Sequence, residues 1–184
     1  MNHFCEEIYG FAQNDLLALY KKVVDIFPSG SHFVEVGSFL GKSTVFMAVE
    51  IINSGKRIKL DCVDHWRGSE EHHDNKKIDV ENLYEDFIKN TQPLKRLITP
   101  VRMDSIEASK LYHPNSLDFI FIDASHDEPL VKKDLAYWYL RLKEDGIIAG
   151  DDVDNEGVIN ALKWFFDIEK IEIAGRQWFL DLRN

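Results

Sequence analysis

Polar residues that could do chemistry stand where the sequence predicts the ends of buried strands. Five short apolar runs lead into segments 35–41, 64–66, 104–105, 123–126 and 150–152, and four of these five carry an acid at or just past the last apolar residue. Because the carboxyl ends of parallel strands meet at one edge of a sheet, we expect the five segments to form one cleft. An acid-rich edge favours a ligand that offers hydroxyl groups and positive charge.

The first segment is a glycine-containing turn with the sequence VEVGSFLGKST. Gly37 and Gly41 permit a tight turn, and the helix expected after them offers unpaired N–H groups to an anion. The turn is not a P-loop, because Val36 stands where the first glycine is required, so an NTPase is a remote alternative. Phe39 replaces the second glycine of a dinucleotide-binding fingerprint. Asp64, at the end of the second apolar run, could still accept two hydrogen bonds from a vicinal diol.

Three further acids, Asp123, Asp151 and Asp152, follow two other apolar runs. Neighbouring strands lie about 4.8 Å apart, so the three carboxylates would converge if these strands are adjacent. They would then repel one another and raise each other's pKa. A divalent cation would relieve this, and oxygen ligands favour Mg²⁺, Mn²⁺ or Ca²⁺. The alternative is that one or two of these acids cap helices or face solvent.

His126 lies three residues past Asp123. An imidazole titrates close to neutral pH and is therefore suited to act as a general base. At this place it could deprotonate a substrate hydroxyl group. The structural alternative is that it caps the following helix together with Ser125 and Asp127.

The elements that must position these groups alternate between strands and helices. Strands are predicted over residues 32–37, 58–64, 97–103, 117–123 and 146–150, and a closing hairpin over 169–174 and 177–182. Apolar residues at helical spacing predict helices near 16–27, 45–52, 80–88, 105–112, 131–142 and 158–165. This order predicts an α/β fold with a doubly wound, mostly parallel seven-stranded sheet and a C-terminal antiparallel hairpin.

Length and composition predict one domain over residues 1–184. The chain is 45% hydrophobic and 12% aromatic, which is enough for a sizeable core. Its net charge of −10 disfavours binding to nucleic acid or to an anionic membrane. Two cysteines are too few for a disulfide framework, and neither a signal peptide nor a membrane span is visible, so we expect a cytoplasmic protein.

Two segments of this domain could border the cleft. Residues 1–30 form an N-terminal helical segment whose aromatic residues could cover the pocket or a partner subunit, so a homo-oligomer stays open. Residues 65–79 are a polar loop that could act as a lid. Its acidic and histidine run favours a solvated loop over a metal site; the run is Glu70, Glu71, His72, His73 and Asp74.

Five motifs in this order resemble those of class I S-adenosylmethionine-dependent methyltransferases. They are VEVGSFLGKST, LDCVDHWRG, MDSIEASKLY, SLDFIFIDASH and GIIAGDDV, and the resemblance runs from about residue 32 to residue 162. The closest resemblance is to a small O-methyltransferase-like group with Asp-x-Trp-x-Gly after strand two and Ile-Asp-x-x-His at strand four. The resemblance implies a Rossmann-like fold.

The resemblance also implies a cofactor site for S-adenosyl-L-methionine. The glycine turn would cradle the methionine part, with Glu35 beside the sulfonium, and Asp64 would hold the ribose hydroxyls. Asp104 would accept a hydrogen bond from the adenine amine. A structural alternative for Glu35 is a strand-end carboxylate bound to nearby N–H groups. The predicted cofactor residues are Glu35, Gly37, Ser38, Gly41, Ser43, Asp64, His65, Trp66, Asp104 and Ser105.

The implied activity is transfer of a methyl group to an oxygen of a small molecule, a sugar or a phenolic compound. Catechol-type relatives bind a metal with acids at matching strand ends, which implies Asp123, Asp151 and Asp152 as ligands. These relatives carry a lysine at the place of His126, so the residues themselves, rather than the resemblance, predict His126 and Asp123 as catalytic. This chain has Asp151-Asp152-Val153 where His-Asp-Tyr is expected. The alternatives are a methyltransferase without metal and a non-catalytic module that binds the cofactor or a sugar.

Overall fold

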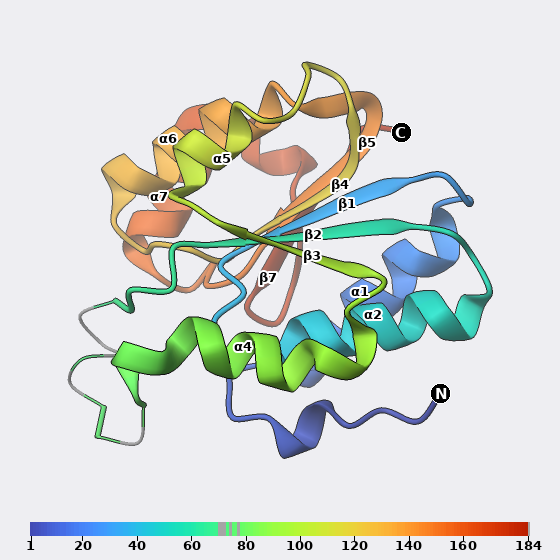
Figure 1. Cartoon of the computed structure of the whole chain (residues 1–184). Helices are drawn as coiled ribbons and strands as arrows, with labels where there is room; N and C mark the ends of the chain where they lie inside the picture. The colour runs from blue at the N-terminus through green and yellow to red at the C-terminus, as the bar shows by residue number, and fades with distance from the viewer. Residues whose placement is uncertain (70–72, 74, 77, 184) are drawn as a thin grey trace.

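A computed structural model describes residues 1–69, 73, 75–76 and 78–183 (Figure 1). Its described strands form one seven-stranded sheet in the order β3-β2-β1-β4-β5-β7-β6. The first five strands are parallel, and β7 pairs antiparallel with both β5 and β6. The bounds are β1 His32–Val36, β2 Lys59–Asp64, β3 Ile98–Arg102, β4 Leu117–Ile122, β5 Leu142–Gly150, β6 Glu172–Ala174 and β7 Gln177–Asp181. The predicted fold class is confirmed.

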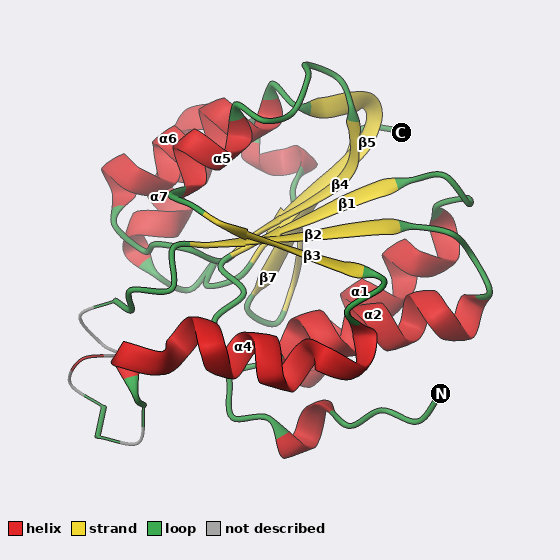
Figure 2. Ribbon diagram, in the orientation of Figure 1, coloured by secondary structure: helices red, strands yellow, loops and turns green. Residues whose placement is uncertain are grey.

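Helices cover both faces of this sheet (Figure 2). One face carries α1 (Asn14–Ile26), α2 (Lys42–Ser54) and α4 (Leu83–Thr91). The other carries α5 (Ser105–Ser109), α6 (Glu128–Tyr139) and α7 (Glu156–Phe165). Short 3-10 turns complete the described elements: η1 Cys5–Glu7, η2 Val80–Asn82, η3 Gln92–Leu94 and η4 Ile168–Lys170.

Successive side chains along each strand point to opposite faces of the sheet, which explains why helices pack on both faces. In β1, Phe33 packs in the core on the side of α1 and α2, whereas Val34 and Val36 pack on the side of α6 and α7. All six residues of β4 are buried, as expected for a central strand covered on both faces. The sheet therefore has a rigid centre, and its loops can be positioned accurately.

The order of strands reverses direction at β1, which lies between β2 and β4. In sheets of this kind the connections after the two neighbouring strands leave toward opposite faces, and a crevice opens at their carboxyl ends. The segments predicted to do chemistry after β1, β2, β4 and β5 therefore come to one edge of the sheet.

Some predicted boundaries move for local reasons. The fifth strand begins at Leu142 rather than at 146, with a register shift against β4 between Leu117 and Phe119. The first strand of the hairpin begins at Glu172, because residues Ile168–Lys170 form a 3-10 turn. The helix predicted over 105–112 ends at Ser109.

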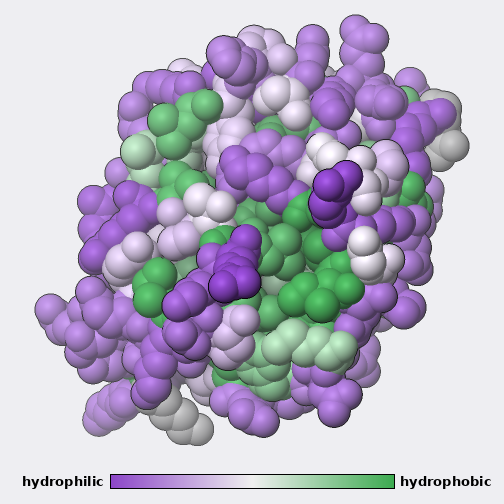
Figure 3. All heavy atoms as spheres, turned by 45° about the vertical axis from the view of Figure 1, so that its right-hand side comes forward, coloured by the Kyte–Doolittle hydropathy of each residue, from purple (hydrophilic) through white to green (hydrophobic). Residues whose placement is uncertain are grey.

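Most of the molecular face in Figure 3 is hydrophilic, with a group of hydrophobic residues near its centre. This agrees with the abundance of charged residues, which make up 29% of the chain. Among the described residues, none of the helices combines the length and apolar composition that crossing a bilayer requires.

Candidate active site

A cleft of about 850 Å³ opens at the carboxyl ends of the parallel strands. This volume is within the usual range for sites that bind small molecules. Most of the predicted site residues line the cleft: Gly37, Ser38, Ser43, Asp64, His65, Trp66, Ser105, Asp123, His126, Asp151 and Asp152. Of the predicted residues that the structure describes, Glu35, Gly41 and Asp104 stay outside this lining.

Glu35 lies beneath the cleft and is fully buried. One carboxylate oxygen accepts a hydrogen bond from the Tyr20 hydroxyl at 2.8 Å, and the other accepts one from the Thr44 hydroxyl. Burial raises the pKa of Glu35, and these hydroxyl donors oppose that rise. Glu35 ties α1 and α2 to the end of β1 and supports the turn from below, and its place beside a sulfonium stays a prediction.

Gly37 is required by a close approach of two strand ends. Its φ is +93°, and a Cβ atom would stand 1.8 Å from the carbonyl oxygen of Asp123. The Asp123 N–H donates to the Val36 carbonyl at 2.8 Å. The turn after β1 and the turn after β4 are thus in direct backbone contact, which places the predicted cofactor and catalytic segments next to each other. Gly41, at φ +89°, precedes α2 and packs against Phe87 and Thr91.

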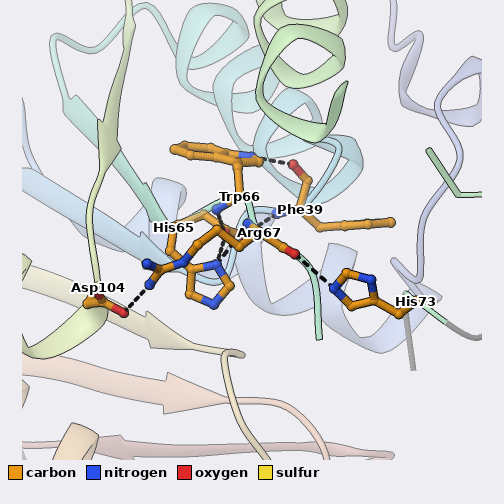
Figure 4. Close-up of polar contacts among 7 residues, drawn as sticks. Phe39, His65, Trp66, Arg67, His73 and Asp104 are labelled. Carbon is orange, nitrogen blue, oxygen red and sulfur yellow. Dashed lines mark hydrogen bonds and ion pairs between the residues drawn. The ribbon is translucent and has the colours of Figure 1, made fainter. Parts of the chain in front are cut away.

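Asp64 connects the ends of β1 and β2. One carboxylate oxygen accepts from the Phe39 N–H at 2.9 Å, and the other accepts from the Trp66 N–H at 2.7 Å. The indole Nε1 of Trp66 donates to the Phe39 carbonyl at 2.7 Å (Figure 4). These bonds hold the turn after β1 and the turn after β2 together as one cleft wall.

Trp66 is 2% exposed, and its ring packs against Phe87 and Tyr84 at 4.7 and 5.0 Å between centroids. The indole belongs mainly to the core on the α4 side, and the role of Trp66 in cofactor binding stays a prediction. His65, whose side chain is 41% exposed, is the flanking residue that the cleft presents.

The end of β3 differs from the expectation for adenine binding. The Asp104 carboxylate is exposed and accepts from the Arg67 guanidinium at 2.7 Å, as Figure 4 shows. The Ser105 hydroxyl donates to Asp134 at 2.5 Å and accepts from the Trp138 Nε1 at 2.8 Å. Burial raises the pKa of Asp134 to about 6. Ser105 therefore lies at the cleft with its hydroxyl tied to α6.

Three catalytic-type groups meet at the ends of β4 and β5. Ligand atoms of Asp123, His126 and Asp152 lie within 4.8 Å of one another. The Nε2 of His126 is 2.5 Å from a carboxylate oxygen of Asp152. Asp151, predicted as a metal ligand, instead accepts from the Gln177 amide at 3.0 Å and from the Asp152 N–H at 2.6 Å. The predicted trio of acids is therefore not the group that the fold brings together.

Arg176, which the sequence reasoning left without a role, also lines the cleft. Its guanidinium pairs with Asp152, and its Nε lies 3.8 Å from Asp151 and 3.5 Å from Asp154. The residue lies in the turn between β6 and β7. The pairing of β7 with β5 brings this hairpin turn toward the acids after β5.

Burial and negative neighbours set the protonation of the cluster. Burial raises the pKa of Asp123 to about 7; nearby Asp151 raises it further, and His126 and Arg176 oppose the rise. Burial also raises the pKa of Asp151, and Arg176 opposes that rise. The cluster therefore holds less negative charge near neutral pH than three free carboxylates would.

Backbone conformations that are strained for non-glycine residues occur mainly at this cleft. Of the four non-glycine residues with positive φ in the described chain, three line the cleft: Phe39, Trp66 and Asp152, at +46°, +49° and +60°. Such conformations cost about 1–3 kcal/mol each and persist where surrounding contacts impose them. Here the surrounding hydrogen bonds of Asp64 and the ion pairs of Asp152 impose them.

The cleft mouth is bordered by two chain segments. Phe11 is 66% exposed and stacks on Phe39 with centroids 6.4 Å apart, and Tyr9 contacts Phe11 at 5.8 Å. The Asn75 amide donates to the Tyr9 hydroxyl at 3.1 Å. The N-terminal segment therefore touches the predicted lid loop, of which Glu70, Glu71, His72 and Asp74 lie outside the described residues. His73 contacts the Arg67 carbonyl at 3.2 Å (Figure 4).

Comparison with known proteins agrees with this geometry. Residues 34–153 match a family model described as a methyltransferase domain, which is more than half of the chain. The chain belongs to this methyltransferase family. A search of curated proteins gives no match to this methyltransferase.

Solved structures share the methyltransferase's fold at low sequence identity. A putative caffeoyl-CoA O-methyltransferase from Staphylococcus aureus is 14% identical, with a TM-score of 0.66 over 96% of this chain and 87% of its own. An O-methyltransferase from Bacillus cereus, solved with S-adenosylhomocysteine, is 17% identical, with a TM-score of 0.59 over 93% and 82%. A precorrin 8w decarboxylase from Methanobacterium thermoautotrophicum is 16% identical, with a TM-score of 0.62 over 92% and 79%.

Replacing Tyr20 with Phe should destabilise this methyltransferase. The change leaves a buried Glu35 oxygen without its donor, and we expect a loss of about 1–3 kcal/mol in the free energy of unfolding. Urea unfolding at pH 7 measures the loss. The exposed Tyr137, changed to Phe, is the control and should be neutral. Equal stability of the two variants would contradict the supporting role of Glu35.

Asp123→Asn should stabilise the fold more at high pH than at low pH. The folded-state pKa of Asp123 is about 7, against about 3.9 in an unfolded chain. Between these two pH values the folded state keeps a proton that the unfolded state has released. The free energy of unfolding of the wild type therefore falls as the pH rises, and the whole loss is present above pH 7. An asparagine does not ionise. We expect its advantage over wild type to grow by roughly 2 kcal/mol between pH 5 and pH 8.

Urea unfolding of both proteins at the two pH values measures this growth. The exposed Asp25, changed to Asn, is the matched control and should show no such trend. A constant difference between wild type and Asp123→Asn at pH 5 and pH 8 would mean that Asp123 ionises normally.

Proposed function

We propose that this protein transfers a methyl group from S-adenosylmethionine to an oxygen of a small molecule. The observation that carries the proposal is the direct backbone contact of Gly37 with Asp123. It sets a glycine turn of the methyltransferase type beside the His126–Asp152 pair within one cleft. A methyl donor held by the turn would therefore lie next to a base, which is what transfer to a hydroxyl group requires.

The turn and Asp64 supply the cofactor half of the site. Gly37, Ser38 and Ser43 line the cleft and would surround the amino-acid part of the cofactor. Each Asp64 oxygen accepts one backbone hydrogen bond, and a carboxylate oxygen has a second lone pair for a ribose hydroxyl. The Bacillus cereus O-methyltransferase that shares this fold was solved with S-adenosylhomocysteine, the product of such a donor.

His126 and Asp152 supply the acceptor half. With its Nε2–H donated to Asp152, the imidazole keeps a lone pair on Nδ1, which can take the proton from an acceptor hydroxyl. The oxygen then attacks the methyl carbon in line with the carbon–sulfur bond. That bond breaks, its electron pair stays on the sulfur, and neutral S-adenosylhomocysteine leaves. The Asp152 carboxylate stabilises the imidazolium that forms.

Positioning provides most of the acceleration in such a displacement, because the reaction needs an in-line approach of two bound partners. The aromatic side chains of Tyr9, Phe11 and Phe39 at the mouth favour a flat phenolic acceptor over a sugar. The net charge of −10 disfavours a nucleic-acid acceptor. The NTPase alternative finds no support in Lys42, whose ammonium pairs with Glu6 at 3.0 Å.

Cofactor binding can be tested by the thermal unfolding of the whole chain. S-adenosylhomocysteine at a concentration of 100 times its Kd should stabilise the protein by about 2.7 kcal/mol, and ATP should not. Asp64→Asn should weaken S-adenosylhomocysteine at least tenfold in a calorimetric titration, whereas the exposed Asp104, changed to Asn, should weaken it less. Stabilisation by ATP, with none by S-adenosylhomocysteine, would reject the proposed cofactor.

Catalysis can be tested with a panel of phenolic and sugar acceptors and a labelled methyl donor. His126→Ala should lower kcat about 10²–10⁴-fold, the usual contribution of a general base, and leave the affinity for S-adenosylhomocysteine unchanged. His113→Ala, at an exposed position, is the control. Tight cofactor binding without turnover by the wild type on any acceptor would favour the non-catalytic module. Full activity of the His126 variant would assign the base elsewhere.

A further inference from the structure

The acidic residues after β5 are already close to a cationic side chain of the protein, Arg176. The guanidinium of Arg176 pairs with one oxygen of Asp152, and its Nε lies 3.5 Å from Asp154 and 3.8 Å from Asp151. The other Asp152 oxygen is 2.5 Å from the His126 Nε2. Asp152 is therefore held between an arginine and the proposed base, and it is 6% exposed.

The fold fixes Arg176 in this place. Its carbonyl accepts a hydrogen bond from the Val153 N–H at 3.0 Å. The preceding Gly175 has φ +62° and packs so closely on α1 that a Cβ atom would stand 2.0 Å from the Asp15 carboxylate. The following Gln177 donates its amide to Asp151 at 3.0 Å. Arg176 is thus part of a turn anchored on three sides.

A divalent ion fits this arrangement poorly. Hard cations need several free oxygen ligands, and Mg²⁺ needs near-octahedral geometry. Both oxygens of Asp152 are already paired, and the Oδ1 of Asp151 accepts from an amide and from a backbone N–H. A metal on Asp123, His126 and Asp152 would have to take Asp152 from Arg176 and also detach His126 from it. The predicted metal site therefore does not agree with the contacts that the chain makes.

We propose that Arg176 is a positioning residue that balances the acids after β5 and holds Asp152 against His126, so that methyl transfer needs no divalent metal. The inference rests on the proposed function for the role of His126. A planar guanidinium suits this task because it presents several donors in fixed directions and keeps its charge at any physiological pH. Arg176 acts through Asp152, which holds His126 in place, and His126 takes the proton.

The first test titrates Mn²⁺ and Mg²⁺ into the whole chain without cofactor or acceptor, so its outcome is independent of methyl transfer. Isothermal calorimetry of the wild type should show no saturable binding up to millimolar metal. Arg176→Gln should bind Mn²⁺ at least tenfold more tightly than the wild type, because it frees an Asp152 oxygen. Arg183→Gln, which removes an arginine paired with Asp181 outside the cleft, should behave as the wild type. Micromolar Mn²⁺ binding by the wild type would overturn the proposal.

The second test measures turnover on the acceptor found in the panel above. The wild type should keep its full rate in excess EDTA. Arg176→Gln should lower kcat about 10–100-fold with little change in KM for the cofactor, Arg176→Lys should restore part of the loss, and Arg183→Gln should keep the wild-type kcat. Loss of activity in EDTA that Mg²⁺ restores would overturn the proposal, as would an unchanged kcat in Arg176→Gln. If no acceptor is methylated, the proposed function fails, while the metal titration still decides whether Arg176 excludes the ion.

Discussion

At the centre of the sheet, the backbone of Gly37 passes directly over the carbonyl of Asp123. No side chain fits in that gap, and every larger residue would push the turn after β1 away from the turn after β4. The contact forms at the switch point of strand order, where a crevice is topologically required. The glycine turn and Asp64 border one side of this crevice, and His126 and Asp152 border the other. Their distances from one another follow from a backbone contact, which side-chain motion cannot relax.

Several carboxylates lie in the cleft or directly beneath it, and the bonding partners of each one differ. Glu35 is bound by hydroxyl groups and supports the turn, whereas Asp64 is bound by backbone N–H groups and joins two turns. Asp152 is paired with an arginine and a histidine. Asp123 has a raised pKa because burial and a neighbouring acid disfavour its charge. Residues of one chemical class thus serve as support, as wall and as candidate reactive groups, and burial together with the available donors distinguishes them.

The sequence predicted the fold and the edge at which the site would form, because hydrophobic periodicity fixes the element types and parallel strands end together. It could not predict where side chains point. Glu35 and Trp66 both lie in motifs of the cleft, yet Glu35 lies on the α1 side of β1 and the Trp66 ring packs on α4. The motif gives the backbone position, whereas the direction of the side chain depends on packing partners such as Tyr20 and Phe87, which come from distant parts of the chain.

Arg176 shows a second limit of prediction from the sequence. Three acids in the sequence suggest a metal because their mutual repulsion must be balanced, but a cationic side chain balances it as well as an ion does. The answer depends on the antiparallel register of β7 on β5, where Gly150 lies opposite Trp178. That pairing brings the turn before β7 to the end of β5, and Gly175 lets the turn pack on α1 so that Arg176 faces the acids. The acids that repel one another are close in the sequence, but the residue that balances their charge, Arg176, is brought to them by the tertiary fold.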